Sequence, residues 1–510
     1  MSDNSSNNKR IARNTAFLYI RMLFVLVVSL YTSRVILSTL GVEDYGVYNV
    51  VAGFVAMFGF LNSTLSASMQ RFYNYEGTKQ GEIGYTKVYS TGFYIHVALS
   101  AVLLVVLESF GLWYVNNIMV VDPSRLMAAN LLYQFSIASM ILVVMGIPYI
   151  GVIMAKERMD FYAIVSIVDV VLKLAIVVIL PYMPCDKLII YGILLLSISI
   201  INFLFYVIYS LKNFKFLNLK EGIDRTIFNS LLSFSGWNLI GTFAFMLKGQ
   251  GLNMLLNVFF GPVINAARGI AYQINSAITG FSANISTAFR PQIVNAYADQ
   301  NYDRARKMMF VESKVCFALL LLLAVPIALE IDYLLRIWLG DIVPQHTNTF
   351  AVLVLIDSVV CTLNTPCTQV VFATGKLKNY QIASTIVNLC LLPACWLFLM
   401  LGFEANMVFI LTIVFSIINQ TVCLIYTNKV FSVGIATYIK EVCLPCVLAF
   451  FFLPIIPYLV HSCLTEGFVR MVVVGFVDLL VGAVITYYVL LGEPERQFVK
   501  SFIWIRIKKY

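Results

Sequence analysis

The chain is poor in charged residues. Asp, Glu, Lys and Arg together make up only 12% of its 510 residues, whereas 60% of the residues are hydrophobic. Soluble domains are about a quarter charged and roughly half apolar. An apolar surplus of this size exceeds what a globular core can bury, so the composition excludes an ordinary soluble protein and predicts a chain surrounded by lipid.

Motifs for catalysis, cofactors and metals are missing. The three histidines, His96, His346 and His461, stand far apart, and no metal-site spacing occurs. There is no GxxxxGK[ST] loop and no nucleophile elbow. The CLPC stretch from Cys443 to Cys446 lacks the βαβ surroundings of a redox motif. We therefore expect no enzyme activity, no catalytic residue, no cofactor and no resident metal.

Long apolar runs follow one another along the chain. About 20 apolar residues in a helix cross a bilayer, and the sequence predicts about fourteen such helices, at 14–38, 47–69, 88–110, 126–151, 161–182, 188–211, 227–258, 264–289, 308–330, 349–373, 379–401, 405–427, 441–461 and 468–491. The expected fold class is therefore an all-α integral membrane protein. No small-residue cleavage site follows the first run, so we expect its helix to be retained.

The basic residues are distributed unevenly between the two sides of these helices. If the N-terminus is cytoplasmic, 25 of the 35 Lys and Arg residues lie in cytoplasmic segments and only four in outward-facing ones. This bias is typical of membrane topology. It predicts an even number of spans with both termini cytoplasmic, and it accounts for most of the net charge of +9 without a nucleic-acid partner.

The two halves of the chain share an internal repeat. Aligning Pro148 with Pro366 pairs Tyr162 with Tyr380 at the same offset, 218 residues. Because this offset spans six predicted helices, we expect two parallel six-helix lobes. The predicted boundaries are an N-lobe at 1–211, a cytoplasmic linker at 212–226, a C-lobe at 227–428, and two further helices with a basic cytoplasmic tail at 429–510.

Several ionisable residues lie inside the predicted spans, where such residues usually face a bundle interior or a wet cavity. The candidates for binding an anionic substrate are Arg34, Arg268, Lys248 and Lys173. Arg34 could instead extend to the outer headgroups, and Lys173 could pair with Asp169, four residues earlier. Lys314 is expected to reach the cytoplasmic surface.

One predicted helix, 264–289, carries a continuous polar stripe. The residues on this face are Arg268, Tyr272, Asn275, Thr279, Ser282 and Ser286. Spacings of three and four place them on one side of the helix, and such a stripe must face protein or water. We expect it to line a cavity, with Arg268 suited to phosphate. Hydrogen bonding to other helices is the alternative. Asp357 and Asp169 are the candidates for ion coupling.

The chain resembles the polysaccharide-flippase (Wzx-type) branch of the multidrug/oligosaccharidyl-lipid/polysaccharide exporter superfamily. The resemblance rests on Arg34, Gly41, Gly46 and Tyr48 across the first turn, on the basic loop after the fourth helix and on the two lobes. It implies a V-shaped central cavity and transport of a polyprenyl-diphosphate-linked oligosaccharide across the bacterial inner membrane by alternating access. The product would be O-antigen, capsule or exopolysaccharide. The implied partners are the lipid-linked anionic glycan, membrane lipids, and glycan polymerase with other assembly proteins.

Three other functions remain open at this stage. A multidrug/cation antiporter of the same superfamily should favour carboxylates over cations in its cavity. A flippase for the peptidoglycan lipid precursor shares the diphosphate chemistry, so cations do not separate it from a glycan flippase. A non-transporting scaffold for glycan assembly would not need the buried cations.

Overall fold

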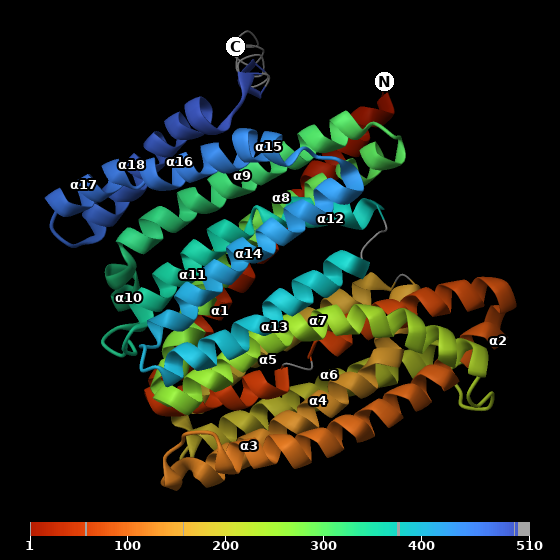
Figure 1. Ribbon diagram of the computed structural model, residues 1–510. Coiled ribbons are helices and arrows are strands. Elements are labelled where there is room, and N and C mark those ends of the chain that lie inside the picture. Colours follow the sequence, from red (N-terminus) through yellow and green to blue (C-terminus); the bar gives the residue numbers. More distant parts are fainter. Residues whose placement is uncertain (1, 57–58, 157, 375–377, 494, 498–510) are drawn as a thin grey trace. The chain divides into compact units, whose positions relative to one another are not determined.

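The structure is a computed structural model that describes residues 2–56, 59–156, 158–374, 378–493 and 495–497 (Figure 1). No strand occurs in these ranges, and the predicted all-α class is confirmed. The α-helices are α1 Ser2–Ala56, α2 Phe60–Val106, α3 Leu112–Asn117, α4 Leu126–Ala155, α5 Met159–Ile179, α6 Lys187–Asn213, α7 Arg225–Phe260, α8 Pro262–Ala298, α9 Tyr302–Leu329, α10 Ile331–Leu339, α11 Thr347–Cys361, α12 Asn364–Thr374, α13 Lys378–Met400, α14 Asn406–Phe431, α15 Ile435–Tyr438, α16 Leu444–Phe452, α17 Ile455–Cys463 and α18 Phe468–Ile485. Short 3-10 and π turns are η2 Leu107–Gly111, η3 Pro123–Arg125, η4 Leu180–Tyr182, η5 Ile439–Cys443 and η6 Thr486–Leu490.

Within the described residues, 10 helical segments are long and apolar enough to cross a membrane. Each of them overlaps one of the predicted spans. The other four predicted spans, 14–38, 47–69, 227–258 and 264–289, fall on α1, on the end of α1 with the start of α2, on α7 and on α8. Their described residues are almost entirely helical, and their crossing of the membrane stays a prediction. The multi-span architecture is confirmed.

Glycines in the left-handed region mark the turns between the first predicted spans. Gly41 has φ 83° inside α1, and Gly81 has φ 61° inside α2. A side chain at this φ is strained, whereas glycine is not. No atom lies within 4 Å of a Cβ placed at Gly41 or Gly81. Backbone conformation therefore explains the glycines at both turns, since there is room for a side chain.

The chain forms two compact units, Met1–Gly269 and Ile270–Tyr510, and the boundary between them falls within α8. The core of the first unit includes Tyr73, Leu132 and Tyr133. The core of the second includes Leu320, Val371 and Tyr438. The first unit contains α7 and the first turns of α8 in addition to α1–α6. The lobe boundaries at 211, 226 and 428 stay a prediction.

The predicted linker, 212–226, packs against α2 within the first unit. The Thr86 hydroxyl donates to the Phe216 carbonyl at 2.8 Å, and the Asp224 amide donates to the Thr91 hydroxyl at 2.9 Å. The Lys156 ammonium lies 5.2 Å from the Phe216 ring centroid, a distance at which cations and aromatic rings attract. These contacts fix the linker to the first unit.

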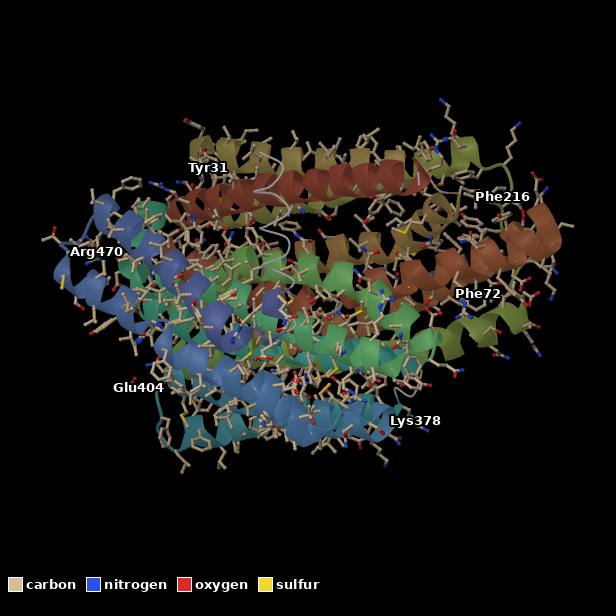
Figure 2. The ribbon with its side chains drawn as sticks, turned by 90° about the horizontal axis from the view of Figure 1, so that it is seen from above. Tyr31, Phe72, Phe216, Lys378, Glu404 and Arg470 are labelled. Atoms are coloured by element: carbon tan, nitrogen blue, oxygen red, sulfur yellow. The ribbon has the colours of Figure 1, made fainter. Side chains whose placement is uncertain are left out.

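The topology predicted from the Lys and Arg distribution assigns each loop to one of the two membrane sides, and loops of opposite sides should lie at opposite ends of a unit. Figure 2 shows Lys378 at one end of the second unit, and Glu404 and Arg470 at the opposite end. In the first unit, Phe216 lies far from Tyr31 along the helices (Figure 2). These labelled residues lie at the ends that the predicted alternation of the helices assigns to them, and which end is cytoplasmic stays a prediction.

Candidate functional site

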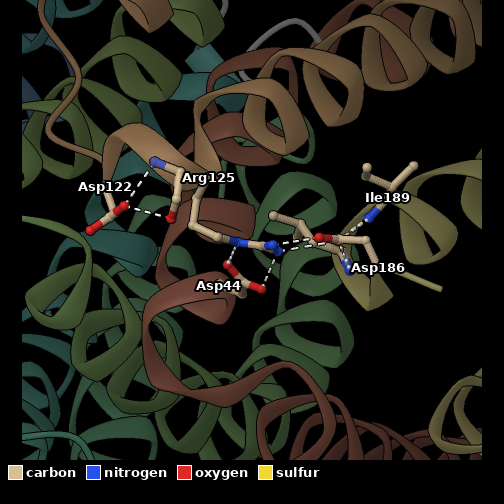
Figure 3. Close-up of polar contacts among 7 residues, drawn as sticks. Asp44, Asp122, Arg125, Asp186 and Ile189 are labelled. Atoms are coloured by element: carbon tan, nitrogen blue, oxygen red, sulfur yellow. Dashed lines mark hydrogen bonds and ion pairs between the residues drawn. The ribbon is translucent and has the colours of Figure 1, made fainter. Parts of the chain in front are cut away.

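An ion cluster built around Arg125 joins α1, α6 and the start of α4 in the first unit (Figure 3). Arg125 Nε donates to Asp44 Oδ1 at 2.8 Å, and Nη2 donates to Asp44 Oδ2 at 2.5 Å. Two further bonds run from the same guanidinium to the carboxylate of Asp186. Asp44 lies on α1 just after Gly41, and Asp186 directly precedes α6. Arg125 therefore ties α1 and α6 to the start of α4.

Asp186 has a second role as the N-cap of α6. Its Oδ1 accepts hydrogen bonds from the backbone amides of Leu188 at 3.0 Å and Ile189 at 3.2 Å. These amides are the unpaired donors at a helix start. The hydrogen bonds from Arg125 and from these amides lower the pKa of Asp186, against the opposing effect of partial burial. The sequence shows Asp44 in its acidic turn, but not the arginine that binds it.

Arg268 is buried on α8, 9% exposed, and its guanidinium donates to the Gly249 carbonyl on α7 at 2.8 Å. Lys248 is half-buried on the same turn of α7. The Arg268 guanidinium therefore lies against the turn of α7 that carries Lys248, within the first unit. Arg34 is exposed on α1, and the joint binding of a diphosphate by these three residues stays a prediction.

Asparagines hold α7 in place around these cations. Asn253 Nδ2 donates to the Asn49 carbonyl on α1 at 3.0 Å, and Asn265 Nδ2 donates to Asn253 Oδ1 at 2.9 Å. Asn257 accepts from the Val120 amide at 2.8 Å. These buried side chains bond to neighbouring helices and to the loop at Val120, as is common in membrane bundles, whereas Asn265 Oδ1 has no hydrogen bond within the described residues. They fix the turn of α7 that carries Lys248.

The predicted pair of Asp169 and Lys173 forms on α5. Lys173 Nζ lies 2.7 Å from Asp169 Oδ2, and Asn202 on α6 donates to Asp169 Oδ1 at 2.8 Å. The contact that the i,i+4 spacing allows is thus confirmed. Asp169 therefore bonds to Lys173 on its own helix and to Asn202 on α6, and the second of these bonds links α5 to α6. Roles in substrate binding and ion coupling stay predictions for these residues.

The rest of the polar stripe belongs to the second unit. Ser358 on α11 donates to Asn275 Oδ1 at 2.6 Å, and the Thr279 hydroxyl donates to the Asn275 carbonyl at 3.0 Å. Tyr272 is half-buried. Asp357 is half-buried beside Cys361, whose Sγ lies 4.0 Å from Asp357 Oδ1. The stripe thus makes helix contacts at Asn275, and its place along a cavity stays a prediction.

Three charged residues on α9 or at its end were misjudged or overlooked from sequence. Lys314 does not reach the surface: it is 6% exposed, and its Nζ lies 2.6 Å from Glu495 Oε2. Glu330 is 1% exposed and accepts from Arg470 at 2.9 Å. Glu312 is fully buried. Both acids lie in the predicted span 308–330, so the number of cations and acids within the predicted spans does not by itself separate an anion carrier from a cation antiporter.

Comparisons with known proteins identify the fold. No protein-family model matches the chain, and no curated protein sequence matches it. Among solved structures, the lipid II flippase MurJ in an inward closed conformation matches with a TM-score of 0.71 and 15% identity, over 92% of this chain and 98% of that one. An inward-facing MATE-family multidrug resistance transporter of the MOP superfamily matches with a TM-score of 0.61 and 14% identity, over 81% of this chain and 98% of that one. An outward-facing MATE-family multidrug resistance transporter of the MOP superfamily matches with a TM-score of 0.54 and 14% identity, over 82% of this chain and 95% of that one.

These similarities place the chain in a structural class. It is a multi-helix membrane protein with the fold of MOP-superfamily transporters, as the sequence resemblance predicted. The structural similarity establishes the fold, whereas identities of 14–15% leave the cargo to be argued from the residues.

Proposed function

We propose that the chain is a flippase that moves a polyprenyl-diphosphate-linked oligosaccharide across the bacterial inner membrane by alternating access, for surface polysaccharide synthesis. The observation that carries this proposal is the buried Arg268 beside the α7 turn of Lys248. Two cations carried on adjoining turns of two helices, inside predicted spans, are suited to an anionic group.

The chemistry of arginine favours a phosphate as this anion. A guanidinium presents five N–H donors in a planar fork that matches two phosphate oxygens. The amides and hydroxyls farther along α8, at Asn275 and Thr279, are suited to sugar hydroxyls. In the proposal the diphosphate binds Arg268, Lys248 and Arg34, and the polyprenyl chain stays in lipid.

A peptidoglycan lipid-precursor flippase is the second candidate, because the lipid II flippase gives a TM-score of 0.71 over 92% of the chain. The MATE structures, at 0.61 and 0.54, cover less of it, 81% and 82%. We therefore favour a lipid-linked cargo over a small organic cation.

Replacing Arg268 in the source cell tests the proposal. Arg268→Ala should remove surface polysaccharide and leave its lipid-linked precursor inside, while growth continues. Arg268→Lys should retain part of the activity, because it keeps the charge without the fork. Arg304→Ala is the matched control, since Arg304 is exposed on the first turn of α9.

Membrane levels of each variant are measured in parallel, so that loss of folding is separated from loss of transport. Full surface glycan with Arg268→Ala at normal protein level would contradict the proposal. Death of cells depleted of the chain, with surface glycan unaffected beforehand, would favour the peptidoglycan lipid precursor as cargo.

A further inference from the structure

A buried carboxyl and a buried carboxamide meet inside the second unit. Glu312 on α9 is fully buried, and Gln369 on α12 is 7% exposed. Gln369 Nε2 donates to Glu312 Oε1 at 3.0 Å and lies 3.4 Å from the Ser286 carbonyl on α8. The pair therefore connects α9, α12 and α8. The pair belongs to the second unit, whereas Arg268 and Lys248 belong to the first.

This pair holds more acceptors than donors. Glu312 Oε2 and Gln369 Oε1 are both buried, and neither has a hydrogen-bond partner within the described residues. Buried polar atoms are almost always paired, and an unpaired one costs about 1–3 kcal/mol. An ionised carboxylate at this place would add the larger cost of a buried charge. One added positive species between the two oxygens would remove both costs.

A proton fits this place better than a metal ion. Hard cations such as Ca²⁺ and Mg²⁺ take about six oxygen ligands or more. The neighbours of the pair are Cys316 and Ser286, whose hydroxyl lies 3.6 Å from Cys316 Sγ and also acts as a donor toward the Glu312 carboxyl. Across the described part of the chain, no group of three histidine, cysteine or acidic residues could hold a metal. A carboxylic acid needs only one acceptor for its proton, and Gln369 Oε1 is such an acceptor.

We propose that Glu312 and Gln369 form a proton-binding site that couples proton movement to transport; the coupling rests on the proposed function, whereas the site does not. In the loaded state the Glu312 O–H donates to the amide oxygen of Gln369, and the amide N–H donates back. In the unloaded state the proton has passed to water. The carboxylate that remains is stable only if water reaches it.

The backbone around Gln369 allows such a movement. The helix is interrupted between Cys361 and Asn364, where α11 ends and α12 begins. The Leu363 carbonyl in this break accepts from the Tyr438 hydroxyl at 3.3 Å. In the proposal, α12 moves against α9 at this break. Proton loss would favour the state in which α12 has moved away and the carboxylate is hydrated.

Other ionisable groups lie on the elements around Glu312. On α8, Arg290 lies one turn beyond Ser286, with its guanidinium 6.0 Å from the Phe372 ring. On α9, Lys314 pairs with Glu495, and Cys316 shares the cluster. On α18, which also packs against α9, Asp478 is fully buried, and neither of its carboxylate oxygens has a hydrogen bond within the described chain. A test must therefore separate Glu312 from Asp478.

Infrared difference spectroscopy on the purified full chain in lipid nanodiscs tests the site directly. The Asp478→Asn variant serves as the background, and Glu312→Gln is added to it. We expect the added change to remove a protonated-carboxyl band at neutral pH. Gln369→Leu should keep that band and shift its frequency, because the acid loses its acceptor. The proposal is overturned if adding Glu312→Gln removes no protonated-carboxyl band. It is also overturned if this band appears only when sodium is replaced by a large organic cation.

Transport in proteoliposomes then tests the coupling. In the Asp478→Asn background, a proton gradient should raise the flipping rate several-fold. Once Glu312→Gln is added, the flipping rate should be the same with and without the gradient. Gradient stimulation that persists with Glu312→Gln would refute the coupling. If the unsubstituted chain flips no lipid-linked glycan, the proposed function and the coupling built on it fail, and the infrared result still decides the proton site.

Discussion

The Arg125 cluster gives the sharpest prediction for stability. Arg125→Met keeps an apolar stem of similar length but removes four hydrogen bonds to two carboxylates, and it leaves Asp44 and Asp186 facing each other. The side chains of Arg125, Asp44 and Asp186 are 26%, 16% and 29% exposed. Exposed ion pairs contribute about 0–1 kcal/mol, whereas breaking a buried one costs about 3–5 kcal/mol. Because the exposure of these three side chains lies between that of an exposed and that of a buried ion pair, we expect Arg125→Met to lower the free energy of unfolding by about 2 kcal/mol.

Thermal unfolding of the purified chain in detergent, followed by tryptophan fluorescence, measures this loss. A domain of about 150–250 residues shifts by roughly 2–4 °C per kcal/mol, and the low end applies to a unit as large as Met1–Gly269. Arg125→Met should therefore lower the midpoint by about 4 °C. Arg336→Ala is the control, because Arg336 and its partner Glu466 are 62% and 37% exposed. It should change the midpoint by less than about 2 °C.

The difference in unfolding midpoint between the parent chain and Arg125→Met should depend on pH because of Asp186. Its pKa is lowered in the folded state by the hydrogen bonds from Arg125. A lowered carboxyl pKa stabilises the fold above the unfolded-state value of about 3.9, and this stabilisation is lost as the pH falls through the folded-state pKa. The midpoints of the parent and Arg125→Met should therefore converge below about pH 4. A difference that is the same at pH 7 and pH 3, or no difference at pH 7, would refute the reasoning.

Three further substitutions test other parts of the structure. Gly41→Ala should destabilise the chain by about 1–2 kcal/mol through its positive φ alone; an unchanged unfolding midpoint would show that the turn is built differently. Glu495→Gln removes the carboxylate from the buried Lys314 and should cost about 3 kcal/mol, measured as a lower midpoint than that of Glu466→Gln. Lys173→Met removes a half-exposed ion pair and should lower the free energy of unfolding by less than about 1 kcal/mol. A normal unfolding midpoint with reduced flipping would assign Lys173 to substrate binding. Normal flipping would leave Lys173 a structural residue.

The fold could be predicted from the sequence because membrane burial leaves a strong signal. Runs of about 20 apolar residues, the one-sided distribution of Lys and Arg, and glycines at turns such as Gly41 are local features. The i,i+4 pair of Asp169 and Lys173 is local too, and it formed as its spacing allows.

The partners of the buried polar residues could not be predicted in this way. Arg125 binds Asp44, 81 residues away, and Lys314 binds Glu495, 181 residues away. No local pattern links such residues. Glu312 could have been noticed as an acid inside a predicted span, but its partner Gln369 comes from another helix, 57 residues on. Side-chain direction, and not spacing, determines these contacts.

The most direct test of the central claim uses purified chain in proteoliposomes that contain a labelled polyprenyl-diphosphate oligosaccharide. An impermeant reagent that modifies the sugar reports how much of the lipid has crossed. The account predicts rapid crossing with the parent chain and with Arg304→Ala, and crossing at the protein-free rate with Arg268→Ala. Crossing at the parental rate with Arg268→Ala, or none with the parent chain, would contradict it.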